Sequence, residues 1–349
     1  MNNFLDKIAN LRETPLGSFV PVMIALVAIW IYFGINEPIF LSPRNFYYLF
    51  MQSAVVGTLA VGVTMVLLLG DIDLSIGAVA GVCAATLAVL TTNMGLYAPY
   101  AIIISLLFGA ILGCIMGAII AYVKIPSFVV TLAGLLGFQG LMMKILGING
   151  AINVRDPIIR SISTTTLPTT IGMVLAIIGV VLFGYLIIRN RSIRSKKNLE
   201  NETNLVSAVK FLFFSILIIG ATILLNLYKG VPILILILLA LTFLLGWIST
   251  STSYGRSIFA VGGNAESARR VGISIEFIKI SAFGIVGFMA AVGGLIGASR
   301  YASVSFNAFA GGPLLLEAIG AAVIGVTSLF GGRGSVWNAI LGALVIGSL

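Results

Sequence analysis

The stretch YGRSIFAVGGNAESARRVGI, residues 254–273, is polar and rich in glycine, and it separates two long apolar runs at 231–248 and 275–299. Apolar runs of about 20 residues are long enough to cross the hydrocarbon core of a bilayer as helices. The polar stretch therefore predicts a loop that its flanking spans hold at a membrane surface.

Signals at both ends predict a short helix of about two turns inside this loop. Asn264 is a favoured N-cap residue, and Glu266 lies in the first turn, where the helix dipole favours a negative charge. Arg269 and Arg270 lie in the last turn, and Gly272 follows as the C′ glycine. The order of these residues is what a helix with complete caps requires.

The predicted helix is suited to dock into a groove of a partner protein. We expect the backbone to turn sharply at Gly262 and Gly263, directly before it. Ala265 and Ala268 are three residues apart, so they should share one face and make it flat enough for the groove of a partner.

Composition places the whole chain in a membrane, because 59% of its residues are hydrophobic and only 9% are charged. The apolar runs are continuous rather than alternating, which favours packed helices over a β-barrel. The net charge of +9 would also suit a nucleic-acid-binding protein, but the charges flank the apolar runs, so we expect no nucleic-acid partner. There is no histidine, and the two cysteines lie in apolar runs, so we expect no catalytic, metal or cofactor site.

We predict an all-α bundle of about 10 or 11 spans, a single membrane domain over residues 1–349 with no soluble domain. The expected spans are 16–35, 47–70, 74–92, 98–122, 127–147, 168–188, 205–227, 231–248, 275–299, 314–330 and 336–349. The last would rise only about 21 Å as a helix, so we expect the chain to be truncated inside it. A re-entrant or interfacial segment is the alternative.

The basic residues predict the orientation. With the tail 1–15, which carries Lys7 and Arg12, in the cytoplasm, 14 basic residues fall inside and 6 outside. The basic loop 189–204 and the loop 249–274 are then cytoplasmic. The basic loop is either a topology determinant or a surface for anionic lipid.

Two acidic residues, Asp71 and Asp73, interrupt the apolar runs. Near a boundary they would cap the span that begins near Leu74, whereas deeper in the membrane they would form a gate or part of a solute path. Glu317 opens another apolar run, either as a first-turn charge or as a contact at the mouth of that path. Polarity alone adds three candidates for the path, which are Ser75, Thr131 and Gln139.

Small residues and a weak repeat bear on packing. Glycines spaced four apart, at 109, 113 and 117 and at 77 and 81, indicate close helix packing within the chain or a seam between two copies. Residues 57–64 and 320–327 share the pattern Gly-x-x-x-x-Gly-Val-Thr, and each run leads through a glycine-containing break to a serine followed by an apolar residue. The match is either chance or an internal repeat of the kind that transporters use.

Four motifs in order resemble the ABC-type permeases for ribose, xylose and galactose. They are GDIDLSIG at 70–77, IPSFVVTL at 125–132, the 254–273 stretch, and EAIG at 317–320 with SLFGGRG at 328–334. Asp71 departs from the family signature, which has a second glycine there. The chain also has an extra segment at about 189–230, so its length is similar to that of the xylose-type members.

The resemblance implies a permease that imports a pentose or hexose by alternating access. It implies an ABC ATPase subunit, a periplasmic or lipid-anchored sugar-binding protein, a second permease chain, surrounding membrane lipid, and a bacterial inner-membrane location. It makes 249–274 the coupling loop, with its contacts at Gly255, Arg256, Gly262, Gly263, Asn264, Ala265, Ala268, Arg269 and Gly272.

Two other functions fit less of the sequence. The chain has no Walker A motif, so the energy source must lie on another chain or in an ion gradient. An ion-coupled transporter would be expected to keep ionisable residues at mid-membrane, and beyond Lys144 there are almost none. An intramembrane aspartyl protease would draw its two carboxylates from different helices, whereas Asp71 and Asp73 share one break.

Overall fold

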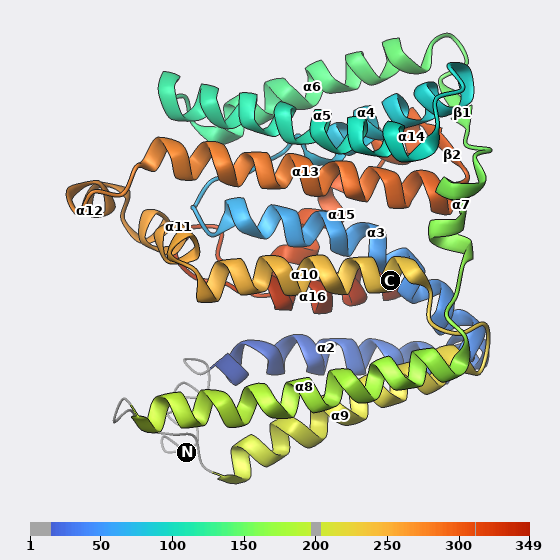
Figure 1. The fold of residues 1–349 in the computed structure, drawn as a ribbon, viewed down its shortest axis with the longest axis vertical. Coiled ribbons are helices and arrows are strands. Elements are labelled where there is room, and N and C mark those ends of the chain that lie inside the picture. Colours follow the sequence, from blue (N-terminus) through green and yellow to red (C-terminus); the bar gives the residue numbers. More distant parts are fainter. Residues whose placement is uncertain (1–14, 197–203, 311) are drawn as a thin grey trace.

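The computed structural model describes residues 15–196, 204–310 and 312–349, and this part of the chain is a bundle of helices (Figure 1). The predicted tail with Lys7 and Arg12, and the middle of the predicted basic loop, lie outside the described residues. The all-α prediction is confirmed.

Nine helical segments of the described residues are long and apolar enough to cross a membrane, and two shorter apolar helices accompany them. The first half of the chain contains α2 (Pro15–Asn36), α3 (Pro43–Leu67), α4 (Ile76–Ala88), α5 (Ala98–Ala118), α6 (Ser127–Leu146), α7 (Pro157–Thr164) and α8 (Thr169–Lys196). The second half contains α9 (Asn204–Asn226), α10 (Ile233–Ser251), α11 (Ser253–Gly263), α12 (Ala265–Arg270), α13 (Ile275–Tyr301), α14 (Phe306–Phe309), α15 (Leu314–Ile324) and α16 (Val336–Ser348). Short helical turns occur at Pro38–Leu41, Val89–Asn93 and Ile119–Val123.

The two ends of the bundle differ (Figure 1). At one end α12 projects beyond the long helices, with α11 beside it (Figure 1). At the other end β1 (Ala151–Asn153) pairs antiparallel with β2 (Ser303–Ser305), next to α7 and α14. We call these the α12 end and the β end.

The core lies around α3 and α13, of which most residues are buried. Glycines allow α5 to approach α13 closely: a Cβ added at Gly113 would overlap the carbonyl oxygen of Phe283, and one at Gly109 would overlap that of Gly287. The prediction that this stripe packs within the chain is confirmed. In contrast, α8 and α9 form an outer layer with mostly exposed apolar side chains, as suits helices that face lipid.

Two helix boundaries correct the sequence predictions. The expected span 314–330 ends at Ile324, because Gly325 closes the helix and Val326 has a positive φ of 63°. The expected turn at Gly262 and Gly263 is wrong, since α11 continues through both glycines and the chain turns at Asn264, whose φ is −162°.

Two irregular segments interrupt the long helices near the α12 end. The first break, residues 68–75, separates α3 from α4, and the second break, residues 325–335, separates α15 from α16. Ser75 precedes α4 as Ser335 precedes α16. The first member of the weak repeat, 57–64, is wholly helical, whereas the second, 320–327, runs past the end of α15.

Candidate functional site

The protruding helix α12 has the predicted caps. The Asn264 side chain accepts a hydrogen bond from the backbone N of Ser267 at 2.8 Å, and Gly272 has a φ of 86° just after the helix. The predicted flat alanine face is wrong, however: Ala265 is exposed, but Ala268 is 3% exposed and packs into the core of its own chain. The free surface of α12 is therefore its charged side.

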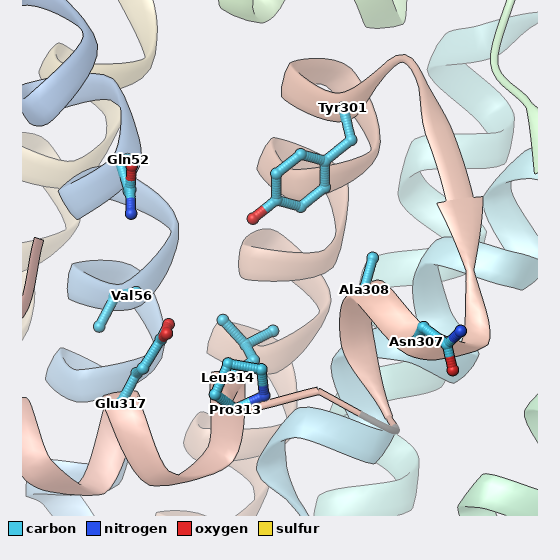
Figure 2. A pocket seen from close by; sticks show the side chains of 8 residues that line it. All are labelled: Gln52, Val56, Tyr301, Asn307, Ala308, Pro313, Leu314 and Glu317. Atoms are coloured by element: carbon cyan, nitrogen blue, oxygen red, sulfur yellow. The ribbon is translucent and has the colours of Figure 1, made fainter.

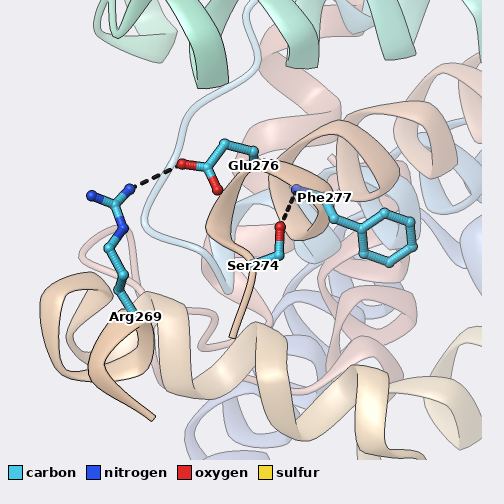
Figure 3. A network of polar contacts seen from close by, with 4 residues as sticks. All are labelled: Arg269, Ser274, Glu276 and Phe277. Carbon is cyan, nitrogen blue, oxygen red and sulfur yellow. Dashed lines mark hydrogen bonds and ion pairs between the residues drawn. The ribbon is translucent and has the colours of Figure 1, made fainter. Parts of the chain in front are cut away.

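Two ion pairs order the charges of that side. The guanidinium of Arg269 lies 3.0 Å from Oε1 of Glu276 at the start of α13 (Figure 3), and Nε of Arg270 lies 3.6 Å from Oε1 of Glu266. Three of these side chains are more than half exposed and Glu276 is 34% exposed, so each pair contributes at most about 1 kcal/mol to stability. The pairs orient the charges at the surface rather than hold the fold together.

Helix α11 anchors α12 to the bundle. The hydroxyl of Tyr254 lies 2.8 Å from Oγ of Ser281 in α13, and burial raises the pKa of Tyr254. Of the expected coupling residues, Gly255 is buried against the carbonyl groups of Ile248 and Ser249, whereas Arg256 is exposed. Gly255 thus supports the helix turn, and its neighbour Arg256 is open to a partner.

The first break is held by an ion pair to α13 and by hydrogen bonds within the break. Nζ of Lys279 in α13 lies 2.8 Å from Oδ2 of Asp71, so the prediction of an Asp71 cap is wrong. Asp73 accepts hydrogen bonds from the backbone N of Ser75 at 2.7 Å and from its hydroxyl at 2.6 Å. Ser75, not an aspartate, is the N-cap residue of α4, and Asp73 holds the backbone just before the helix. Burial raises the pKa of Asp73 above its ordinary value, and the two hydrogen bonds from Ser75 offset only part of that rise.

Thr131 and Gln139, predicted together with Ser75 as residues of a solute path, hydrogen-bond to backbone carbonyl groups of other segments. The hydroxyl of Thr131 donates to the carbonyl oxygen of Ile72 at 3.2 Å, and Oγ of Ser127 accepts from the N of Ile72 at 3.1 Å. Gln139 donates to the carbonyl oxygen of Ala310 at 2.6 Å. None of these three predicted residues lines the polar pocket described next.

A polar hollow of about 280 Å³ lies between α3, α14, α15 and the end of α13. Its lining consists of Gln52, Val56, Tyr301, Asn307, Ala308, Pro313, Leu314 and Glu317. Figure 2 shows the carboxylate of Glu317 and the hydroxyl of Tyr301 directed into the same space, with the Gln52 amide on the facing helix. Hydroxyl, amide and carboxylate groups beside apolar side chains such as Val56 and Leu314 suit a small polar solute. Of the expected path residues, Glu317 alone lines this pocket.

The sequence reasoning did not identify Gln52 or Tyr301. Gln52 is an exposed amide between buried neighbours of α3, so a polar residue inside an apolar run was the available signal. Tyr301 had no such signal, because its position follows from the end of α13 at Ala302, where φ is 52°. In the described residues, no three histidine, cysteine or acidic side chains lie together as metal ligands would.

Known proteins similar to this chain are transport system permeases, and the similarity extends over nearly the whole chain. The family model of the branched-chain amino acid transport system permease component matches residues 45–349. The xylose transport system permease protein XylH of Escherichia coli is 37% identical over 98% of this chain and 86% of its own length. The protein of the same name from Haemophilus influenzae is 35% identical, over 94% of this chain and 87% of its own length. The autoinducer 2 import system permease protein LsrC of Salmonella typhimurium is 28% identical, over 92% of this chain and 74% of its own length. No solved structure matches the chain.

Proposed function

We propose, because this chain belongs to the permease component family of the branched-chain amino acid transport system, that it is the membrane subunit of a binding-protein-dependent ABC importer. The observation that carries this proposal is 37% identity to a xylose permease over 98% of the chain. The solute we propose is a monosaccharide, with a pentose such as xylose first.

The polar pocket supports a sugar over an amino acid. The family model is named after branched-chain amino acids, which carry a charged carboxylate and a charged ammonium group, whereas a sugar is neutral. The pocket lining includes the carboxylate of Glu317 but no lysine or arginine. The amide of Gln52, the phenol of Tyr301 and the Glu317 carboxylate are instead groups that hydrogen-bond the hydroxyls of a neutral sugar.

The α12 end is the proposed docking surface for an ATP-hydrolysing subunit. This chain has no Walker A motif, so that subunit would supply the energy for transport. The exposed residues Arg256, Glu266, Arg269 and Arg270 would make the contact. The α12 end and the N-terminus would then face the cytoplasm, and the membrane would be a bacterial inner membrane.

The β end is the proposed docking surface for the sugar-binding protein. Exposed cations gather there, with Arg155 and Arg160 on or beside α7 and Lys144 at the end of α6. A partner with an acidic rim would be attracted to this end.

A second copy of the permease would complete the path. Leu316, next to Glu317 of the pocket lining, is 73% exposed. We propose that two chains face each other across the side of the bundle that carries Leu316 and that ATP-driven changes in their contact open the path to alternate sides of the membrane. An ion-coupled transporter of a small polar solute remains the second candidate function.

Reconstitution tests the proposal. Proteoliposomes would contain the permease with its ATPase subunit, and the binding protein would be added outside with labelled xylose or labelled leucine. We expect ATP-dependent xylose accumulation and no leucine accumulation. Xylose accumulation by the permease alone on an ion gradient would overturn the importer assignment, and ATP-dependent leucine uptake would overturn the sugar assignment.

A further inference from the structure

Backbone atoms of three separate segments meet at one point near the α12 end. We call this point the glycine junction: Gly70 in the first break, Gly262 in the last turn of α11, and Gly331 with Gly332 in the second break. The N of Gly332 donates a hydrogen bond to the carbonyl oxygen of Leu68 at 2.9 Å. This bond ties the second break directly to the first.

The contacts leave no room for a single added carbon. A Cβ at Gly262 would overlap the carbonyl oxygen of Leu68 and lie 2.8 Å from the N of Gly332. A Cβ at Gly331 would lie 2.7 Å from the carbonyl oxygen of Gly262 and 2.7 Å from the N of Gly70. The three segments thus touch backbone to backbone.

Two helices connect this junction to the polar pocket. Helix α3 carries Gln52 and Val56 of the pocket lining and ends at Leu67, next to the junction. Helix α15 carries Glu317 and ends at Ile324, where the second break begins. An α-helix is stiff over the roughly 10–25 Å involved, so a shift at the junction moves the pocket walls.

We propose that Gly262, Gly331 and Gly70 are positioning residues that transmit a displacement of α11 and α12 to α3 and α15, and so set the width of the pocket. This inference rests on the proposed function, in which the ATPase subunit displaces α12. Side chains between the segments would absorb part of such a displacement by changing rotamer, whereas backbone in direct contact passes it on. Docking and transmission are then separate: exposed charges of α12 bind the partner, and the backbone contacts of the junction carry the motion.

The chain provides two matched pairs of variants. Gly179→Ala is the control for Gly262→Ala, because both residues lie in helices and a Cβ at Gly179 meets nothing within 4 Å. Gly95→Ala is the control for Gly331→Ala, because both have a positive φ, 66° and 81°, yet a Cβ at Gly95 meets nothing within 4 Å. Backbone strain is therefore matched in the second pair, and only the contact differs.

The first measurement uses purified permease without its partners. Gln52→Cys is introduced after Cys83 and Cys114 are replaced by alanine, and its rate of alkylation by a small maleimide reports access to the pocket. We expect Gly262→Ala and Gly331→Ala to change this rate about threefold or more, and their controls to leave it within experimental error. Equal rates within each pair would overturn the proposal.

The second measurement uses the reconstituted complex with wild-type cysteines. The junction variants should still bind the ATPase subunit and hydrolyse ATP but should transport about tenfold less sugar per ATP than their controls. A parallel loss of ATPase binding would mean that the glycines only hold the docking surface in shape, and would overturn the proposal. If Gly262→Ala does not fold, the Gly331→Ala and Gly95→Ala pair decides in the same way.

The two measurements separate this inference from the function it rests on. Alkylation needs no ATPase subunit, so a changed rate with no detectable importer activity would support the junction and sink the importer. Unchanged alkylation with intact ATP-dependent xylose uptake would overturn the junction alone.

Discussion

Nζ of Lys279 lies 2.8 Å from Oδ2 of Asp71, which joins the first turns of α13 to the first break. Both side chains are largely buried, at 22% and 11% exposed, so each charge depends on the other. Breaking such a pair from one side leaves a charge without its partner in a poorly solvated place.

We expect the loss of one charge of this pair to destabilise the protein more than the loss of both charges. Lys279→Met should destabilise the protein by about 2 kcal/mol, seen as a lower midpoint of thermal unfolding in detergent. The double variant Asp71→Asn with Lys279→Met should recover much of that loss, because it removes both charges. A single variant as stable as the wild type would contradict a structural role for the pair.

Asp73 is expected to act through its two hydrogen bonds to Ser75. Asp73→Ala removes the acceptor at the start of α4 and should cost about 1 kcal/mol, lowering membrane abundance and sugar uptake together. Asp73→Asn keeps an acceptor oxygen and should preserve both. A loss of uptake in Asp73→Asn at full abundance would instead place Asp73 in the solute path.

Glu317 is expected to contact the solute in the polar pocket. Glu317→Gln should reduce uptake about tenfold while membrane abundance stays unchanged, because a strong acceptor for sugar hydroxyls becomes a weaker one. Glu37→Gln is the matched control, an exposed glutamate outside the pocket lining. Equal uptake by the two variants would exclude Glu317 from the path.

Arg269 is expected to contribute to the ATPase docking surface. Arg269→Glu reverses an exposed charge and sets it against Glu276, so less ATPase subunit should co-purify with the permease. Arg189→Glu is the control, a reversal at the same end of the bundle on α8. We expect full co-purification for Arg189→Glu, and an equal yield from both variants would argue against docking at α12.

The exchange Arg269→Glu with Glu276→Arg distinguishes two causes of such a loss. If the ion pair only orients α12, the exchanged pair should restore co-purification. If the partner reads the charge at residue 269 itself, the exchange should not restore it. Both results keep α12 as the docking surface, and full co-purification by the single variant would remove it.

Local patterns were enough to predict the helices and the caps of α12. Runs of about 20 apolar residues locate spans because the bilayer leaves few other conformations for them. Asn264 and Gly272 mark the ends of α12 because caps depend on neighbours within one turn. The short helix α7 was missed, although Asp156 and Pro157 carry the start signal that the structure confirms.

Contacts between distant residues could be decided only by the tertiary structure. The sequence determined that this is a multi-span helical membrane protein with a capped, charged helix in its polar loop, because helix length and capping are local properties. Only the fold placed Ala268 inside, paired Asp71 with Lys279, and brought Gln52, Tyr301 and Glu317 around one pocket. Each of these depends on how helices far apart in sequence pack and where the two breaks fall, which no periodicity along one helix encodes.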